Sequence, residues 1–297
     1  MPLVSTLNSD GRIKANAALV AAGSAGAVSV YVTNSTHLVI DLNGYFVPAS
    51  TSSGLVFYPF GPCRIADTRL GSAPFGMPSL AAGETRTYAI PTSACAVPGT
   101  AQAYALNVTA VPHGPLWYLT AFPAGQPLPN ISTLNAATGL FTANAAIVNA
   151  GNNGAISVYA SDSTDLVLDV VGYFAPPQPG GLFFYPVTPC RPVDTRLSGQ
   201  MGAFTGAVAF DLSAHGCLSS PNVQAVVANN TVVPTTPLGF LTIWPDQQHQ
   251  PYTSTLNAPD GAITSNMALV QVKDYRIDAF STGPTNLIVD VIGYLGY

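Results

Sequence analysis

The sequence contains few charged residues. Of its 297 residues, 9 are Lys or Arg and 14 are Asp or Glu, so charged side chains make up 8% of the chain, against about 25% in an average soluble protein. A disordered chain is excluded, because such chains are polar or highly charged, whereas this one is 48% apolar. The net charge of −5 offers no basic face to phosphates, so we expect no nucleic-acid partner.

Helix-forming residues and long apolar runs are also scarce. One Glu and two Lys stand against 27 Gly and 26 Pro, which excludes a long-helix protein and leaves an all-β chain with many turns. The most apolar stretches, such as 17–22 and 38–46, fall far short of the roughly 20 residues of a spanning helix, so we expect no membrane span. No basic segment with an apolar run opens the sequence, so we expect any secretory signal to lie outside it.

The chain repeats itself internally. The tetrapeptide Ser-Thr-Leu-Asn begins at Ser5, Ser132 and Ser254, each time followed by an Asn and later by an Asp-x-x-Gly-Tyr ending. We call these units of about 45 residues STLN halves. A second unit of about 70 residues, the DTR half, opens twice with Tyr-Pro-x-x-Pro-Cys-Arg-x-x-Asp-Thr-Arg, at Tyr58 and Tyr185. The order is therefore STLN, DTR, STLN, DTR, STLN.

Short β-branched and aromatic runs recur in every half. In the first STLN half, 28–32 and 38–42 predict two strands joined by a polar turn. In the first DTR half, 85–90, 103–111 and 116–122 predict strands separated by Pro and Gly turns. Eight or nine strands in each period predict an all-β fold of tandem antiparallel β-sandwich modules, Ig-like or jelly-roll-like, of about 120 residues each. A propeller is the alternative, but its blades repeat every 40–50 residues or so.

The repeat divides the chain into three parts. Residues 1–50 are an STLN half whose partner half is missing or supplied by another chain, residues 54–176 form a first β-sandwich module, and residues 181–297 form a second. In the second module a polar turn at 281–285 is expected to separate two strands. Because the N-terminus matches the link that precedes the other STLN halves, we expect the chain to be a segment of a longer one; a natural start at a domain boundary is the alternative.

Each DTR half contains one pair of cysteines, Cys63 with Cys95 and Cys190 with Cys217. Paired placement in a repeat predicts one disulfide per copy, since the CxxC or His spacing of a zinc site is missing. Each bridge would close a loop of about 30 residues and stabilise the fold by roughly 3–4 kcal/mol. Such bridges indicate an oxidising compartment, so we expect an extracellular or cell-surface protein.

The two Cys-Arg-x-x-Asp-Thr-Arg motifs hold four of the seven arginines. One interpretation is a site for carboxylates or sugars, because a guanidinium group binds planar anions in bidentate fashion. We favour an internal Arg–Asp lock, because the protein has so few charges. The residues of the two locks are Arg64, Asp67 and Arg69, and Arg191, Asp194 and Arg196.

The STLN endings supply a recurring carboxylate, at Asp41, Asp169 and Asp290. Calcium needs about six oxygen ligands from several groups, and each ending offers a single acid, so we expect no metal. We predict instead a turn or strand-end role, in which the Asp accepts a backbone N–H and the following Gly adopts an unusual dihedral angle.

No catalytic arrangement is recognisable in the sequence. The four histidines occupy unrelated places in the repeats, and neither HExxH nor GxSxG occurs, so we expect neither enzyme activity nor a cofactor. Aromatic residues recur on one strand of both DTR halves, and core packing is the favoured interpretation. The alternative is a sugar-stacking platform formed by Trp117, Tyr118 and Trp244.

The ordered motifs resemble the tandem repeats of secreted and surface proteins of environmental bacteria such as Acidobacteria, Chloroflexi and actinobacteria. The resemblance rests on Pro-Cys-Arg-x-x-Asp-Thr-Arg, Leu-Asn-Val-Thr, Ser-Thr-Leu-Asn and Asp-Val-x-Gly-Tyr-Phe, and covers nearly the whole chain. It implies an extracellular β-rich module with no catalytic residues to carry over. The second copy has Asn230 in place of the Val of Leu-Asn-Val-Thr, a departure expected to alter only local turn shape.

These observations together predict a non-catalytic extracellular structural protein, a subunit of a bacterial surface filament, sheath or stalk that associates head to tail with copies of itself. The spare STLN half has strand edges that another subunit's strand or half-module can cover. The alternative is a secreted carbohydrate-binding or adhesin module, with a polysaccharide as partner.

Overall fold

The computed structural model describes residues 4–51 and 54–297. These residues form fifteen strands and four 3-10 helices of three residues each, and the strands pair antiparallel throughout. The prediction of an all-β fold is confirmed. No helix in these two ranges is long and apolar enough to cross a membrane.

The first module contains two four-stranded sheets, with orders β1-β8-β3-β6 and β2-β7-β4-β5. The buried side chains of the two sheets form one core that includes Tyr88, Tyr104 and Ile156. The elements are β1 (Val56–Asp67), β2 (Thr85–Ala89), η2 (Ile90–Thr92), β3 (Ala103–Pro112), β4 (Leu116–Pro123), β5 (Leu134–Ala136), β6 (Thr142–Asn149), η3 (Asn152–Gly154), β7 (Ala155–Ala160) and β8 (Thr164–Ala175).

The two halves of this module interleave. The DTR half supplies β1–β4 and the STLN half supplies β5–β8, yet β8 lies between β1 and β3 while β7 lies between β2 and β4. Most ladder hydrogen bonds of β7 and β8 therefore cross from one half to the other. An STLN half without its DTR half has no neighbours for its two central strands.

The second module repeats this arrangement with one difference. Its strand β15 runs without a break and pairs with β10 and β12 in its first part and with β9 and β11 in its second, so that the strands belong to one seven-stranded sheet. The elements are β9 (Phe183–Asp194), β10 (Phe204–Asp211), η4 (Ala214–Gly216), β11 (Val223–Pro234), β12 (Leu238–Pro245), β13 (Leu256–Ala258), β14 (Thr264–Gln271) and β15 (Arg276–Gly296).

The prediction that a turn at 281–285 separates two strands is wrong, because β15 is continuous there. In the ladder with β10, Gly206 pairs with Ser281 and Phe204 pairs with Thr285, so the extra residues form a bulge within one strand. β10 begins at Phe204 and pairs with both parts of β15. In the first module β2 begins only at Thr85, the matching contact with β8 is the isolated bridge between Leu80 and Thr164, and β7 and β8 stay separate.

Asn230, which replaces the Val of the Leu-Asn-Val-Thr motif, was expected to alter the shape of a turn. It lies inside β11 instead, so that expectation is wrong. Its side chain is 1% exposed, like that of Val108 at the same position of the first module. Its Oδ1 has no hydrogen-bond partner. The second module thus carries a polar side chain at a core position, which destabilises it.

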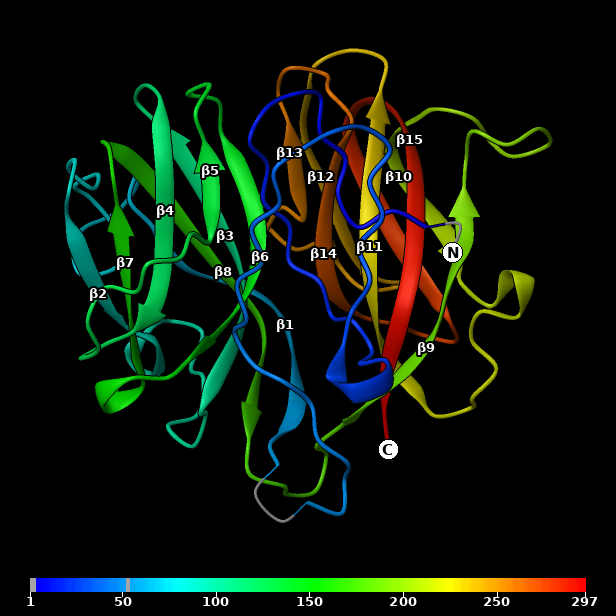
Figure 1. Ribbon diagram of the computed structural model, residues 1–297, viewed down its shortest axis with the longest axis horizontal. Helices are drawn as coiled ribbons and strands as arrows, with labels where there is room; N and C mark the ends of the chain where they lie inside the picture. The colour runs from blue at the N-terminus through cyan, green and yellow to red at the C-terminus, as the bar shows by residue number, and fades with distance from the viewer. Residues whose placement is uncertain (1–3, 52–53) are drawn as a thin grey trace.

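The N-terminal segment, residues 4–51, departs most from expectation. Strands were predicted at 28–32 and 38–42, but this segment contains only the 3-10 helix η1 (Ser24–Gly26). In Figure 1 it runs as a blue, irregular trace between the two modules. The cause is topological: the matching strands β7 and β8 form only between strands of a DTR half, which this segment lacks.

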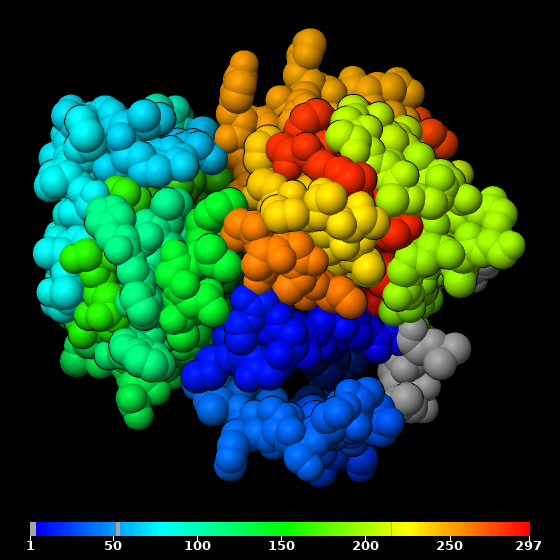
Figure 2. Space-filling view, turned by 90° about the horizontal axis from the view of Figure 1, so that it is seen from above, coloured from blue at the N-terminus to red at the C-terminus, as the bar shows by residue number. Residues whose placement is uncertain are grey.

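All three parts meet in a shared apolar core. Buried side chains of β3 and β6 from the first module and of β11 and β14 from the second form one cluster, against which Ala17 and Leu19 of the N-terminal segment pack. Seen from above in Figure 2, the two modules and the blue segment occupy three corners around a common centre.

Candidate assembly interface

An asparagine ring holds the three STLN halves together. Asn16, Asn144 and Asn266 occupy the same position in their repeats, and each Oδ1 accepts the backbone N–H of the residue that follows the matching Asn in another half. The bonds are Met267 N to Asn16 at 3.0 Å, Ala145 N to Asn266 at 2.9 Å and Ala17 N to Asn144 at 3.2 Å. Because each half both donates and accepts, the three bonds close a cycle with pseudo-threefold character.

A second asparagine, from the DTR half, reinforces this ring. Asn107 accepts the amide of Asn266 at 2.9 Å and donates to the carbonyl of Ser254 at 2.6 Å. Asn229 does the same for the N-terminal segment, accepting from Asn16 at 2.8 Å and donating to the carbonyl of Ser5 at 2.6 Å. Each DTR half therefore binds the STLN half of a different module.

The third STLN half, which contains Asn144, has no corresponding DTR asparagine among the described residues. The amide of Asn144 donates to the carbonyl of Thr133 at 2.7 Å, as Asn266 does to that of Thr255. Among the described residues, however, no DTR asparagine bonds to Asn144. The ring thus contains three STLN positions but only two of the three matching DTR positions.

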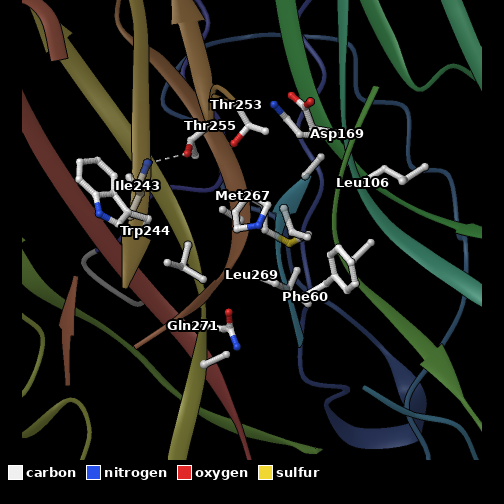
Figure 3. Close-up of a pocket in the computed structure, with 18 of the residues that line it drawn as sticks. Phe60, Leu106, Asp169, Ile243, Trp244, Thr253, Thr255, Met267, Leu269 and Gln271 are labelled. Carbon is white, nitrogen blue, oxygen red and sulfur yellow. Dashed lines mark hydrogen bonds between the residues drawn. The ribbon is translucent and has the colours of Figure 1, made fainter. Parts of the chain in front are cut away.

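Apolar side chains follow the ring asparagines and fill the centre. Ala145 and Ile147 follow Asn144 on β6, and Met267 and Leu269 follow Asn266 on β14. Between the two modules they leave a cavity of about 40 Å³, far below the roughly 300–1,000 Å³ of small-molecule sites. Figure 3 shows Phe60 and Trp244 on opposite sides of it, with Met267 between them.

The N-terminal segment is also attached by polar contacts to the second module. Ser5 donates its backbone N–H to Asp290 at 3.1 Å, and Lys14 donates to the carbonyl of Ile263 at 3.1 Å. Arg12 forms an ion pair with Asp260. These contacts hold the first part of the segment and leave residues 28–46 outside them.

Residues 28–46 expose side chains of a core pattern. Val28, Val30, Leu38, Ile40 and Leu42 are 49–83% exposed. Their counterparts in the first module are all 0% exposed; they are Ile156, Val158, Leu166, Leu168 and Val170. The segment therefore exposes the kinds of side chain that form the core of the first module.

The structure joins the cysteines in the predicted pairs. Cys63 is bonded to Cys95 with their Cα atoms 5.9 Å apart, and Cys190 to Cys217 with their Cα atoms 5.7 Å apart. Each bridge ties the first strand of a module to the loop after β2 or β10.

The arginines of the DTR motif are engaged within the module. Arg64 donates Nε to Asp169 at 2.9 Å and approaches Asp67 at 3.3 Å, while Arg69 binds Asp67 through two nitrogens. Burial raises the pKa of Asp169 to about 6, against the hydrogen bond from Arg64.

The second module repeats the lock with Arg191, Asp194, Arg196 and Asp290. Arg191 donates Nε to Asp290 at 2.7 Å, and Arg196 binds Asp194 through two nitrogens. The hydrogen bond from the Arg196 side chain lowers the pKa of Asp194. In both copies, therefore, the guanidinium groups are bound to carboxylates of their own module.

The prediction that the Asp of the STLN ending lies at a turn or strand end is wrong, although Asp290 does accept a backbone N–H, that of Ser5. Asp169 and Asp290 are 0% exposed, lie within β8 and β15 and pair with arginines of the DTR half. The following Gly172 has no left-handed φ; a Cβ there would clash with the ring of Phe57. The lone equivalent, Asp41, is exposed and has no ion pair with any described residue.

The three aromatic residues predicted as a sugar-stacking platform do not form one exposed surface. Trp244 is 4% exposed and donates its indole N–H to the carbonyl of Gln248 at 3.0 Å, so its ring is not offered to a ligand. Trp117 is 61% exposed, and the neighbouring ring of Tyr118 lies 5.5 Å from that of Tyr159. The two tryptophans lie on equivalent strands but at different positions along them. The sequence analysis assigned both to the same strand and did not compare their positions within it.

One further cluster joins His113, Asp165 and Ser79. His113 Nε2 lies 2.8 Å from one carboxylate oxygen, and Ser79 donates to the other at 2.6 Å. The serine proton is thus directed to the carboxylate and not to the imidazole. Within the described ranges, no three His, Cys, Asp or Glu side chains gather in a metal-binding arrangement.

The chain matches no protein-family model and no curated protein. Among solved structures it is similar to "Cryo-EM structure of T=3 Penaeus vannamei nodavirus", with 12% sequence identity over 93% of this chain and 99% of that chain. The TM-score is 0.22, too low to indicate a shared fold.

Proposed function

We propose that the chain is a non-catalytic, extracellular structural protein, a subunit of a surface filament, sheath or stalk. The observation that carries this proposal is the N-terminal segment, which is fixed to both modules through Asn16 and Ala17 while residues 28–46 expose core-type side chains. Such a surface gains free energy when another chain covers it.

The two disulfides and the low charge support the same proposal. Disulfides of this kind persist in oxidising compartments. A surface with few ions offers little electrostatic repulsion between copies, which favours association.

Negative-stain electron microscopy and size-exclusion chromatography with light scattering test the proposal on the purified chain. We expect filaments or oligomers that grow with protein concentration. A chain that stays monomeric at all concentrations would refute self-assembly.

A carbohydrate-binding module is the second candidate, and one observation favours it: the aromatic ring of Trp117 is 61% exposed and open to a sugar. A polysaccharide pull-down tests it, with Trp117→Ala expected to abolish retention. Tyr252→Ala is the matched control, because Tyr252 is 96% exposed on the second module. Equal retention of all three proteins would exclude the Trp117 platform.

A further inference from the structure

We propose that the N-terminal segment is the docking surface for a third DTR-type half, and that its docking completes a ring of three β-sandwich modules around the shared core. The proposal deepens the proposed function, because it rests on residues 28–46 being an assembly surface and names what covers them. The occupant is a β-segment of about 70 residues of the kind that opens each module.

The ring geometry specifies this occupant. Two of the three STLN halves receive an asparagine from a DTR half, at Asn107 and Asn229. The third STLN half, at Asn144, has the same amide geometry toward its own Thr133 but no such partner among the described residues. A third DTR-type half would place its asparagine there, accepting from Asn144 and donating to the carbonyl of Ser132.

Charge and shape point to the same occupant. Asp41 is the counterpart of Asp169 and Asp290, each of which pairs with the arginine that follows a DTR cysteine. The exposed side chains at 28–32 and 38–42 match β7 and β8, which lie between strands of a DTR half. A DTR-type half supplies both the missing arginine and the missing neighbouring strands.

The two DTR halves within residues 1–297 are not available to cover residues 28–46 of a second copy. Both are paired within their own modules. A copy that lent a DTR half would leave one of its own STLN halves uncovered. Figure 2 shows the consequence: the third corner of the molecule is a thin chain with a hollow within it, beside two filled modules.

The test adds the missing half to the full chain. Residues 54–131, the first DTR half with its natural link, are fused directly before Ser5, and hydrogen exchange of residues 28–46 is measured with and without the fusion. We expect exchange in this range to slow by at least about 100-fold, to the level of β7 and β8. We also expect the added cysteine pair to form a third disulfide, detectable by mass spectrometry.

Two controls isolate the proposed contacts. A fusion whose added copy alone carries Arg64→Ala and Asn107→Ala should lose most of the protection, while the native modules keep theirs. Asp41→Asn should reduce the protection about tenfold in the fusion and change nothing in the unfused chain. Residues 181–253, fused in the same way, provide a second donor half in case the first does not fold in its new position.

Exchange that stays fast in both fusions would overturn the proposal, whatever their oligomeric state. Protection of 28–46 in oligomers of the unfused chain that equals the protection in the fusion would overturn it too, because a second copy would then fill the place of the third DTR-type half. If the unfused chain is always monomeric, the proposed self-assembly is refuted. Slow exchange of residues 28–46 in the fusion would still support the docking of a third DTR-type half. The two failures are therefore distinguishable.

Discussion

Replacing Asn266 with Ala removes the most buried member of the asparagine ring. Its side chain is 1% exposed and makes three hydrogen bonds, from Ala145 N, to Asn107 Oδ1 and to the carbonyl of Thr255. Two of the partner groups, on Ala145 and Asn107, are themselves buried. Orphaning a buried polar group costs about 1–3 kcal/mol, so we expect a loss of about 2–4 kcal/mol in unfolding free energy.

The matched variant is Asn144→Ala. Asn144 is also buried, at the same repeat position, but among the described residues its side chain bonds only to Ala17 N, at 3.2 Å, and to the carbonyl of Thr133. Because the contact with Ala17 is only partly buried, water can replace it more easily than the contacts of Asn266, and we expect a loss of at most about 1 kcal/mol.

Urea unfolding followed by tryptophan fluorescence measures both variants, since Trp244 is buried beside the cavity between the modules. Midpoints can be compared directly if the slopes of the transitions agree. Equal losses for the two variants, or a larger loss for Asn144→Ala, would refute the view that the DTR asparagine gives the ring its stability.

Three further predictions concern single side chains. Arg196→Gln should destabilise the protein by about 1 kcal/mol at pH 7 and by progressively less as the pH falls below 3.8. The hydrogen bond from Arg196 lowers the pKa of Asp194 from 3.8, so the contribution of the pair is present above that value and is lost as the pH falls through the lowered pKa; a difference that persists unchanged in acid would contradict this. Val158→Ser should lower the melting temperature, while Val30→Ser, at the matching but exposed position, should not; equal effects would mean that the N-terminal segment is packed. Asn230→Val should raise the unfolding free energy by about 1–2 kcal/mol, because it removes an unsatisfied buried oxygen; urea denaturation that shows a loss would refute this.

Strands of the two modules were predictable because their pattern is local. Alternating or continuous apolar runs at 103–111 and 116–122 became β3 and β4 with nearly the same bounds. The same kind of pattern at 28–32 and 38–42 gave no strands. A strand is stabilised by its neighbours in the sheet, and those neighbours belong to a half that is not among the described residues.

The ring could not be predicted, although its members were visible as a recurring residue. Asn16, Asn144 and Asn266 bond to groups of other halves, at separations of 121 to 251 residues. No periodicity within a half encodes which amide faces which backbone N–H. Asp169 was likewise assigned to a turn because its partner, Arg64, lies 105 residues away.

The polar ring has a reason to exist within an otherwise apolar interface. The side chains around it are small or flexible, such as Ala145, Ala17 and Met267, and flexible side chains such as Met adapt to more than one packing arrangement. A displaced register would leave buried amides and backbone N–H groups unpaired, at about 1–3 kcal/mol each. The asparagines therefore select one arrangement of the halves, and the open position at Asn144 applies the same selection to any half that docks there.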